Sequence, residues 1–281
     1  MECQSGQTIG SYRLLEKCGA GSYGSVWLAQ NVYSQRRVAL KVLALSDELV
    51  ERELRGLANY RDCRHPNLLQ IHHIDRLDGR IFYTMDAADD AGEDGRYVPD
   101  TLAHRLSKRG RLPVDEIRTM TNELLDGLAC LHKHGLVHRD IKPDNILWVD
   151  GRATLADIGL ASFGDNASLV GTPGYMSEDL VSGKRAASPQ DDLYALGKVV
   201  YCALTGCPAD KFPHFPPDAT LAGAAPLIRT YTAVCQSDSR VRTSEEMRAL
   251  LNAELGESNS NRPRRGLQFA WEPPLALALP V

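Results

Sequence analysis

The sequence predicts an α+β fold in which a β-rich amino-terminal part precedes an α-rich carboxy-terminal part. From about residue 12 to residue 86, β-branched and aromatic residues alternate around glycine-rich turns, which is typical of strands. After residue 100 the apolar residues recur mainly at helical spacing. Residues 89–99 (DDAGEDGRYVP), which lie between the two parts, are acidic and contain glycine, so we expect an exposed connection there.

The composition is that of an ordinary globular protein, with 43% hydrophobic and 24% charged residues, so the chain can bury a core. A net charge of −4 gives no support to nucleic acid or a membrane surface as the main partner. The seven cysteines are scattered without a C-x-x-C pair, which favours reduced thiols over a disulfide framework or a zinc site. No apolar run approaches the roughly 20 residues that a membrane span needs. We therefore expect a cytoplasmic protein with no membrane span and no nucleic-acid partner.

The predicted elements follow in chain order. One amphipathic helix interrupts the strands at residues 47–60. Two longer helices are indicated by apolar residues at helical spacing, namely Ile117, Leu124, Leu128 and Leu131 in one and Leu193, Leu196, Val200 and Leu204 in the other. Short strands with turn residues lie between them, around 138–160. Residues 256–281 are polar and Pro-rich at first, and we expect a loosely ordered tail.

A glycine-rich stretch, Gly-Ala-Gly-Ser-Tyr-Gly at residues 19–24, lies between two strand-like segments. Glycines let backbone N–H groups approach phosphates closely, although a simple hairpin turn would explain the same residues. A dinucleotide-binding fold would require a helix directly after the third glycine. A strand-like segment beginning at Val26 follows instead, so the sequence disfavours that fold.

Lys41 ends the strand-like segment Val38-Ala39-Leu40-Lys41, about 17 residues after Gly24. A lysine in a strand is usually only a solvated residue, but after a glycine-rich loop it matches the lysine that binds the α- and β-phosphates of ATP. Its expected partner is a glutamate on the following helix. Glu53 has a better register than Glu51, and the alternative is a surface carboxylate.

The strongest signal is His-Arg-Asp-Ile-Lys-Pro-Asp-Asn at residues 138–145. In phosphoryl transfer such a loop supplies a base and a metal ligand, since the chemistry depends on positioning and charge compensation. Asp140 would accept or orient the proton of the substrate hydroxyl, Lys142 would neutralise charge on the moving phosphoryl group, and Asn145 would hold Mg²⁺. His138 itself is expected to pack and to form hydrogen bonds rather than to catalyse.

Asp157-Ile158-Gly159 follows Asn145 by about 12 residues. An aspartate here would bridge ATP phosphates through Mg²⁺, a hard cation that prefers oxygen ligands. The alternative is that Asp157 only caps a turn. Ile158 stands where phenylalanine is usual, and because it is also apolar we expect metal binding to survive.

Together these motifs resemble a eukaryotic-like serine/threonine protein kinase from a bacterium, over about residues 9–255. The bacterial subgroup is indicated by Ala-Asp-Ile-Gly-Leu at residues 156–160 and by the segment 192–201. The resemblance implies a bilobal protein-kinase-like fold with an N-lobe at about 9–86 and a C-lobe at about 100–255. It also implies ATP between the lobes, Mg²⁺ (with Mn²⁺ as the alternative), and protein substrates with serine or threonine acceptors.

Carried over by position, the resemblance makes Met85 the gatekeeper, with the Asp86 C=O and the Ala88 N–H on the adenine edge. Three apolar side chains would sandwich the adenine ring: Val26, Ala39 and Leu147. The full set implied to bind ATP is Gly19, Ala20, Gly21, Ser22, Tyr23, Gly24, Val26, Ala39, Lys41, Met85, Asp86, Ala88 and Leu147.

The resemblance also implies an activation segment at residues 157–179. Arg139 would pair with a phosphate on this segment. Of Ser162, Ser168 and Thr172, we expect autophosphorylation at Ser168 above all, and Thr172 is the poorer candidate. Thr172 would shape the acceptor site, with its hydroxyl near Asp140 and Lys142. The alternative is constitutive order, with Arg139 paired to a carboxylate such as Asp165.

One departure from the family pattern concerns a structural ion pair. Ser177-Glu178-Asp179 replaces Ala-Pro-Glu, so Asp179 is the aligned acid, with Glu178 as the alternative. The expected basic partner is Arg242, or else Arg240.

Three classes of protein compete for this sequence. Lys142, two residues after Asp140, favours a serine/threonine kinase over a tyrosine kinase. A pseudokinase that binds ATP as a signalling module is the alternative, but such proteins usually lose one of Lys41, Asp140 and Asp157, and all three are present. A small-molecule kinase is disfavoured because it typically has His-Gly-Asp in place of His-Arg-Asp.

Overall fold

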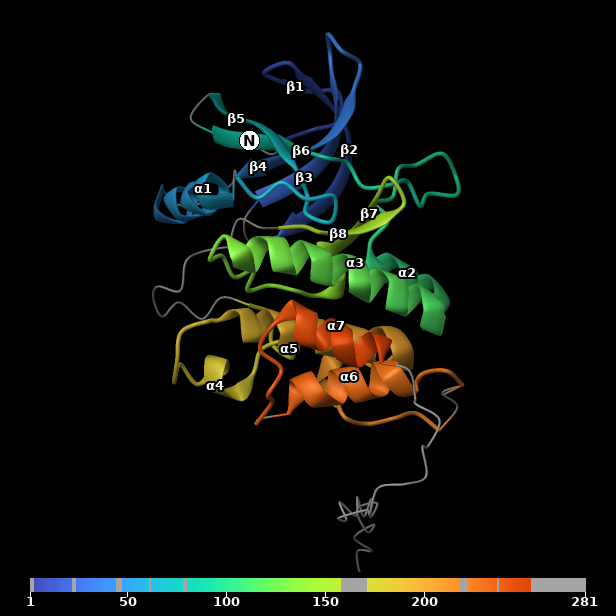
Figure 1. Cartoon of the computed structure of the whole chain (residues 1–281). Helices are drawn as coiled ribbons and strands as arrows, with labels where there is room; N and C mark the ends of the chain where they lie inside the picture. The colour runs from blue at the N-terminus through green and yellow to red at the C-terminus, as the bar shows by residue number, and fades with distance from the viewer. Residues whose placement is uncertain are drawn as a thin grey trace, which may run out of the picture.

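The computed structural model describes residues 3–21, 24–43, 47–60, 62–77, 80–157, 171–217, 222–236 and 238–253. For residues 20, 21, 47–50, 52 and 53 it describes the backbone alone. Figure 1 shows a sheet-rich lobe above a helical lobe, so the predicted bilobal α+β fold is confirmed.

The N-lobe is built on an antiparallel sheet of six strands in the order β1-β2-β3-β4-β6-β5. The strands are β1 (Thr8–Ile9), β2 (Tyr12–Gly21), β3 (Gly24–Asn31), β4 (Arg37–Leu43), β5 (Ile71–Leu77) and β6 (Arg80–Met85). Alternating apolar residues cover one face of the sheet, where Leu14, Leu40 and Phe82 are almost fully buried. This small core fixes the register of β3 against β4, and the register places Val26 opposite Lys41.

Helix α1 (Asp47–Tyr60) connects β4 to β5 and has the predicted bounds. Leu57 packs with Leu43 and Tyr83 in a second small cluster, so the helix is held against the sheet through its apolar stripe.

The C-lobe contains eight helical segments within the described residues. They are α2 (Leu102–Arg109), α3 (Val114–Lys133), the 3₁₀ turn η1 (Pro143–Asn145), α4 (Glu178–Val181), α5 (Pro189–Thr205), α6 (Ala225–Cys235) and α7 (Ser244–Asn252), with a further 3₁₀ turn η3 (Ala209–Lys211) after α5. A two-stranded sheet, β7 (Ile146–Val149) and β8 (Arg152–Leu155), follows η1 directly. Both long helices expected from apolar spacing are present as α3 and α5.

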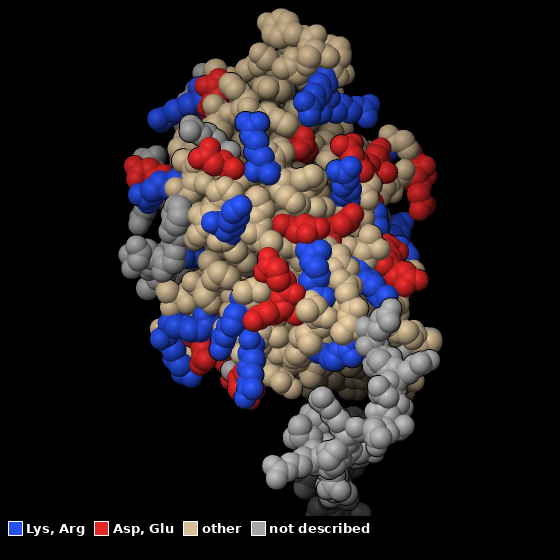
Figure 2. Space-filling model, in the orientation of Figure 1, with Lys and Arg blue, Asp and Glu red and all other residues tan. Residues whose placement is uncertain are grey.

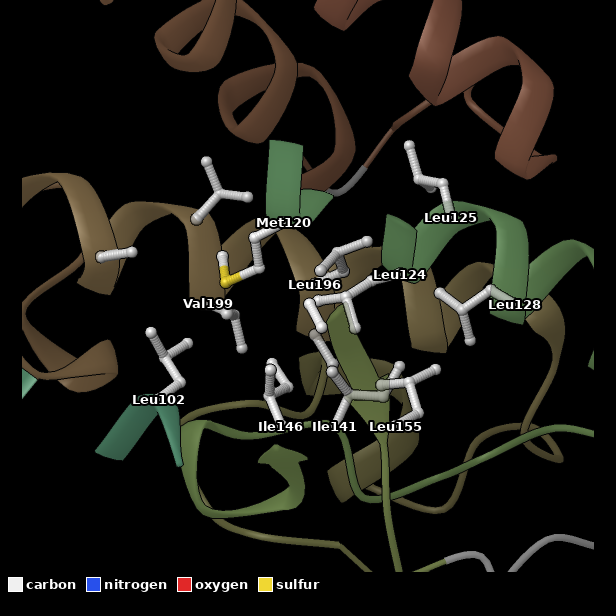
Figure 3. Packing of buried hydrophobic residues seen from close by; sticks show 14 of the residues in the cluster. Leu102, Met120, Leu124, Leu125, Leu128, Ile141, Ile146, Leu155, Leu196 and Val199 are labelled. Carbon is white, nitrogen blue, oxygen red and sulfur yellow. The ribbon is translucent and has the colours of Figure 1, made fainter. Parts of the chain in front are cut away.

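Helix α5 is buried on nearly all sides, which is why its sequence is apolar all round rather than amphipathic. Its start is fixed by a capping box between Ser188 and Asp191, and it ends at Gly206, which takes a left-handed conformation with φ 71°. Figure 3 shows Leu196 and Val199 of this helix packed against Met120 and Leu124 of α3.

The same core also holds Ile141 from within the motif 138–145, Ile146 at the start of β7 and Leu155 at the end of β8. The segment that carries the predicted catalytic residues is therefore pinned on one side by the main core of the C-lobe. Its opposite side faces the N-lobe.

Residues 89–99 differ from the expected exposed connection. Residues 93–96 are exposed, but Tyr97, Val98 and Pro99 are half-buried. The segment folds back on itself, since Asp90 bridges Pro99 and the Ala91 N–H donates to the Val98 C=O at 2.8 Å. We name this closed segment, residues 89–99, the hinge hairpin.

The surface carries charges of both signs. In Figure 2 Lys and Arg side chains are interspersed with Asp and Glu over the face shown. Within the described residues, no helix is both long enough and apolar enough to cross a membrane.

Candidate functional site

A cleft of about 680 Å³ lies between the two lobes. Its walls come from β2, β3 and β4 on one side and from the motif 138–145, β7 and Asp157 on the other. Thirteen of the predicted site residues line it: Gly19, Gly24, Val26, Ala39, Lys41, Met85, Asp86, Ala88, Lys142, Asn145, Leu147, Asp157 and Thr172. The cleft is therefore where segments far apart in the sequence bring the motifs together.

The glycine-rich stretch forms the turn between β2 and β3, and Gly21 pairs with Gly24 at its end. Gly24 has φ +132°, and a Cβ atom there would lie 2.0 Å from the Val42 carbonyl oxygen. This glycine is thus required by the close approach of β4, whatever the loop binds. Ser22 and Tyr23, at the tip of the turn, lie outside the described residues, as do the side chains of Ala20 and Gly21.

The segment after β6 presents unpaired backbone groups to the cleft. Met85 ends β6 opposite Ala39, and the Asp86 N–H donates to the Gln70 C=O at 3.1 Å. Within the described residues, neither the Asp86 C=O nor the Ala88 N–H has a hydrogen-bond partner. One acceptor and one donor side by side can bind the edge of a planar heterocycle, which suits an apolar slot with a few convergent polar groups.

Lys41 is buried, and its Nζ lies 2.8 Å from Asp157 Oδ1. Burial alone would raise the pKa of Asp157, but the attraction and hydrogen bond of the Lys41 ammonium outweigh it, so this pKa lies below its ordinary value. Asp157 is therefore ionised at neutral pH and available to a cation. The expected partner of Lys41, Glu53, lies on α1, but its side chain is outside the part that the structure describes.

Asp140, Lys142 and Thr172 form one hydrogen-bonded triangle. The Thr172 hydroxyl donates to Asp140 Oδ1 at 2.8 Å. The Lys142 ammonium donates to Asp140 Oδ2 at 2.8 Å and to Thr172 Oγ1 at 2.9 Å. The triangle shows directly that an aliphatic hydroxyl fits between this carboxylate and this ammonium.

Asn145 connects the triangle to the metal aspartate predicted from the sequence. Its amide nitrogen donates to the backbone oxygen of Asp140 at 2.8 Å and to Asp140 Oδ2 at 3.0 Å. Its own backbone oxygen accepts the Ala156 N–H at 2.9 Å, next to Asp157. The amide nitrogen is thus committed to Asp140, and the amide oxygen remains for another ligand.

These oxygens fit a magnesium ion. Asn145 and Asp157 offer one amide and one carboxylate oxygen to the same cleft, and hard divalent cations prefer such ligands. The described residues contain no cluster of three or more His, Cys, Asp or Glu side chains that could cage a metal alone. The site therefore suits an ion that takes its other ligands from water and substrate phosphates, as Mg²⁺ usually does.

The carboxylate of Asp192, on α5, fixes the backbone at the start of the motif 138–145. This carboxylate is 1% exposed, and it accepts the His138 N–H at 2.8 Å, the Arg139 N–H at 2.9 Å and a hydrogen bond with His132 Nε2 at 2.8 Å. The His138 ring is fully buried and contacts the Ala156 carbonyl at 3.0 Å, which is the packing and hydrogen-bonding environment expected of it. No role of Asp192 was predicted from the sequence, although an acid at the start of a long apolar helix is a signal for a buried acceptor.

The expected ion pair of Asp179 is not formed. Among the described residues, neither Asp179 nor Glu178 pairs with Arg240 or Arg242; Asp179 instead contacts Lys184 at 3.0 Å on the surface. Arg242 donates to Gln190.

Near this segment the buried carboxylate of Asp191 pairs with the exposed Arg185, at 2.6 and 2.7 Å. Burial alone would raise the pKa of Asp191, but its hydrogen bonds with Arg185 and Ser188 lower it. The prediction for Asp179 was wrong because its side chain lies on the surface, 54% exposed, and contacts the nearby Lys184 in place of the distant Arg242.

Of the activation segment, the structure describes Asp157 and residues 171–179, so Ile158, Gly159, Ser162, Asp165 and Ser168 lie outside the described residues. Arg139, the predicted phosphate partner, takes a left-handed backbone with φ 73° beside Asp140. The regulatory expectation for Ser168 stays a prediction.

Ten further residues that line the cleft were not anticipated as site residues. Among them, Cys18 precedes Gly19 on β2, and Tyr97 comes from the hinge hairpin. Burial, helped by the nearby Glu16, raises the pKa of Cys18 to about 11, so this thiol is protonated at neutral pH. A lone aromatic residue within an acidic, glycine-containing segment was the available signal for Tyr97.

Comparison with known proteins agrees with this geometry. A family model described as the protein kinase domain matches residues 12–266. The chain is 32% identical over 210 residues to the carbon catabolite-derepressing protein kinase of Candida tropicalis, which covers 70% of this chain and 32% of that protein. It is 28% identical over 211 residues to the protein of the same name from Saccharomyces cerevisiae, covering 71% and 31%.

A third relative is the sucrose non-fermenting protein kinase 1 of Fusarium virguliforme, 27% identical over 209 residues, with 71% and 28% covered. The chain thus matches about a third of the length of these curated relatives, all of which are fungal.

Proposed function

The chain belongs to the protein kinase family, and we propose that it transfers the γ-phosphoryl group of ATP to serine and threonine hydroxyls of protein substrates. The observation that carries this proposal is the Thr172 hydroxyl held 2.8 Å from Asp140 and 2.9 Å from Lys142. A substrate hydroxyl of the same chemistry can take an equivalent place at Asp140.

Each residue of the cleft then has one task. Asp140 orients the acceptor hydroxyl and takes its proton, and Lys142 offsets negative charge on the transferred group. Lys41 binds phosphate oxygens, while the Asp86 C=O and the Ala88 N–H bind the adenine edge. When bound, Mg²⁺ (or Mn²⁺) neutralises phosphate charge, and Asn145 and Asp157 would hold it.

The test compares Asp140→Asn and Asp157→Asn in full-length protein with labelled ATP, Mg²⁺ and a generic protein substrate. Asp140→Asn should lower turnover by about 10²–10⁴-fold and leave ATP affinity nearly unchanged, because this residue acts on the hydroxyl. Asp157→Asn should lower both turnover and Mg·ATP affinity. Asp150→Asn, the same change at an exposed position, is the matched control.

The outcomes separate the classes of protein. Wild-type turnover in both variants would refute the assignment of the site. Tight Mg·ATP binding by the wild-type chain without measurable transfer would instead favour the pseudokinase alternative.

Autophosphorylation, the domain limits, the bacterial subgroup and the cytoplasmic location are also proposals. Autophosphorylation at Ser168 would be tested by mass spectrometry after incubation with Mg·ATP, with Ser168→Ala as the variant whose activity should fall. The domain limits 9–255 rest on the extent of the resemblance and the tail 256–281 on composition, and the family match extends to residue 266. The bacterial subgroup rests on residues 156–160 and 192–201, and the cytoplasmic location on the scattered thiols.

A further inference from the structure

The hinge hairpin has a built-in closed form. The Asp90 carboxylate accepts the Gly92 N–H at 2.9 Å and the Val98 N–H at 3.0 Å, so one side chain joins both arms of the segment. A Cβ atom at Gly92 would lie 1.8 Å from the Arg96 carbonyl oxygen, which only glycine permits. The closed form of the segment is therefore stabilised by hydrogen bonds between its own residues.

Both lobes hold this hairpin. On the N-lobe side, Glu16 of β2 accepts the Tyr97 N–H at 2.9 Å. On the C-lobe side, the Asp89 carboxylate accepts the N–H groups of Asp150 and Gly151 at 3.0 and 2.8 Å. These contacts fix the position of Tyr97 relative to the hinge that connects the lobes.

The Tyr97 side chain reaches the hinge itself. Its hydroxyl donates to the Ala88 C=O at 2.9 Å, and both residues line the nucleotide cleft. The Asp89 N–H of the same peptide unit donates to the Trp148 C=O at 2.7 Å. Because the C=O and N–H of a trans peptide point in opposite directions, the Ala88 C=O faces away from Trp148 and toward Tyr97.

This hydroxyl changes what the hinge offers to a base. In the proposed function the Asp86 C=O takes the 6-amino group of adenine and the Ala88 N–H takes N1. Carbon 2 of the purine follows N1 along the same edge and meets the Ala88 C=O next. That oxygen is already engaged by Tyr97, so a hydrogen-bond donor at carbon 2 must share the oxygen or displace the phenol.

We propose that Tyr97 is a specificity-determining residue of the nucleotide cleft, because its hydroxyl competes with a purine for the Ala88 carbonyl oxygen. The inference rests on the proposed function. It predicts that a purine with an amino group at carbon 2 gains less from that group in this protein than it would gain from a carbonyl without the Tyr97 hydrogen bond. Removal of the Tyr97 hydroxyl should restore the gain.

The experiment measures dissociation constants of ADP and 2-aminoadenosine diphosphate by calorimetry with Mg²⁺, so that no phosphoryl transfer intervenes. The proteins are full-length wild type, Tyr97→Phe and Tyr33→Phe. Tyr33 is 84% exposed on the surface, so the third protein is a matched loss of one phenol hydroxyl. Thermal unfolding of all three shows that each is folded.

In Tyr97→Phe the preference for 2-aminoadenosine diphosphate over ADP should rise about three- to tenfold relative to wild type, the value of one hydrogen bond. Tyr33→Phe should keep the wild-type ratio. An unchanged ratio in Tyr97→Phe, with ADP still bound, would overturn the role of Tyr97 alone. Failure of the wild-type chain to bind ADP would instead overturn the proposed function.

Discussion

Two residues of the site, Arg139 and Asp157, hold left-handed backbone conformations with φ 73° and φ 60°. Such conformations cost residues other than glycine about 1 kcal/mol or more, and they persist where neighbours fix them. Arg139 is fixed by its N–H bond to Asp192, and Asp157 by its contact with Lys41. The strain therefore lies where the chain turns the functional side chains into the cleft.

Replacement of Lys41 by methionine should remove the positive charge that offsets the cost of desolvating the Asp157 carboxylate. At pH 7 the charged carboxylate, which is 31% exposed, would then be partly buried without its partner, and the free energy of unfolding should fall by about 1 kcal/mol. Because the pKa of Asp157 is lowered in the folded protein, the stabilisation is present above the unfolded pKa, about 3.9, and is lost as the pH falls through the folded pKa. Urea unfolding at pH 7, 5 and 3.5 measures the difference.

The control for this prediction is Lys184→Met, which breaks the exposed pair with Asp179. That change should cost no more than about 0.5 kcal/mol at any of these pH values. Equal losses in Lys41→Met and Lys184→Met would show that the Lys41–Asp157 contact is not the stabilising one.

Individual residues could be predicted from the sequence where a local motif fixes the geometry. Asp140, Lys142 and Asn145 lie on one short segment, and the structure brings them together within hydrogen-bonding distance. The partner of Asp179 was predicted wrongly, because Lys184, five residues further on, pairs with it in place of the distant Arg242. A long-range pair is decided by packing and not by spacing in the sequence.

At the scale of elements, α5 and α6 pack against each other around Gly197. A Cβ atom on Gly197 would lie 2.4 Å from Val234 Cγ2 and 2.9 Å from Cys235 Sγ, both on α6. The glycine thus permits the close approach of the two helices.

Gly197→Ala should therefore destabilise the protein by about 1–3 kcal/mol, although alanine is the better helix former. The midpoint of denaturant unfolding measures the loss. The double variant Gly197→Ala/Val234→Ala should cost less than the sum of the single variants by at least about 1 kcal/mol, since Val234→Ala makes room for the new methyl group. Strict additivity would argue against this steric explanation.

The long elements followed from periodicity, and α1, α3 and α5 all lie where apolar spacing places them. The short helix α4, with four residues, is too brief to have a period. The hinge hairpin was also missed, because its closure depends on one Asp90 side chain that bonds to two backbone groups. An acidic composition alone indicates an exposed segment and cannot reveal that bond.

For the whole molecule, the hinge hairpin is the part of the connection that contacts both lobes. Glu16→Ala should free it on the N-lobe side only. The amide of Tyr97 should then exchange its hydrogen about five- to tenfold faster, because its acceptor is lost. The amides of Asp150 and Gly151, held by Asp89, serve as the internal control in the same exchange experiment.

Faster exchange at Tyr97 with unchanged exchange at Asp150 and Gly151 is the expected pattern. Equal acceleration at all three amides would mean that the variant loosens the fold in general. No change at Tyr97 would mean that Glu16 does not hold the hairpin in solution.

The bilobal arrangement was predictable because strand-like and helix-like periods occupy separate halves of the chain. The contacts that join the lobes were not predictable, since they depend on side chains such as Glu16 and Asp89 that follow no periodic pattern in the sequence. In the sequence, charged residues that connect the lobes cannot be distinguished from other charged surface residues.

The buried carboxylate of Asp192 bears on how the protein would lose activity when heated. It ties the residues around Asp140 to a helix inside the largest core, while the roof of the cleft belongs to a sheet with a smaller core of its own. On gradual warming, the affinity for nucleotide should therefore fall first, and it should recover on cooling. The phosphate-transfer groups would keep their arrangement until the helical lobe itself unfolds. Irreversible loss of activity would therefore come from the unfolding of that lobe.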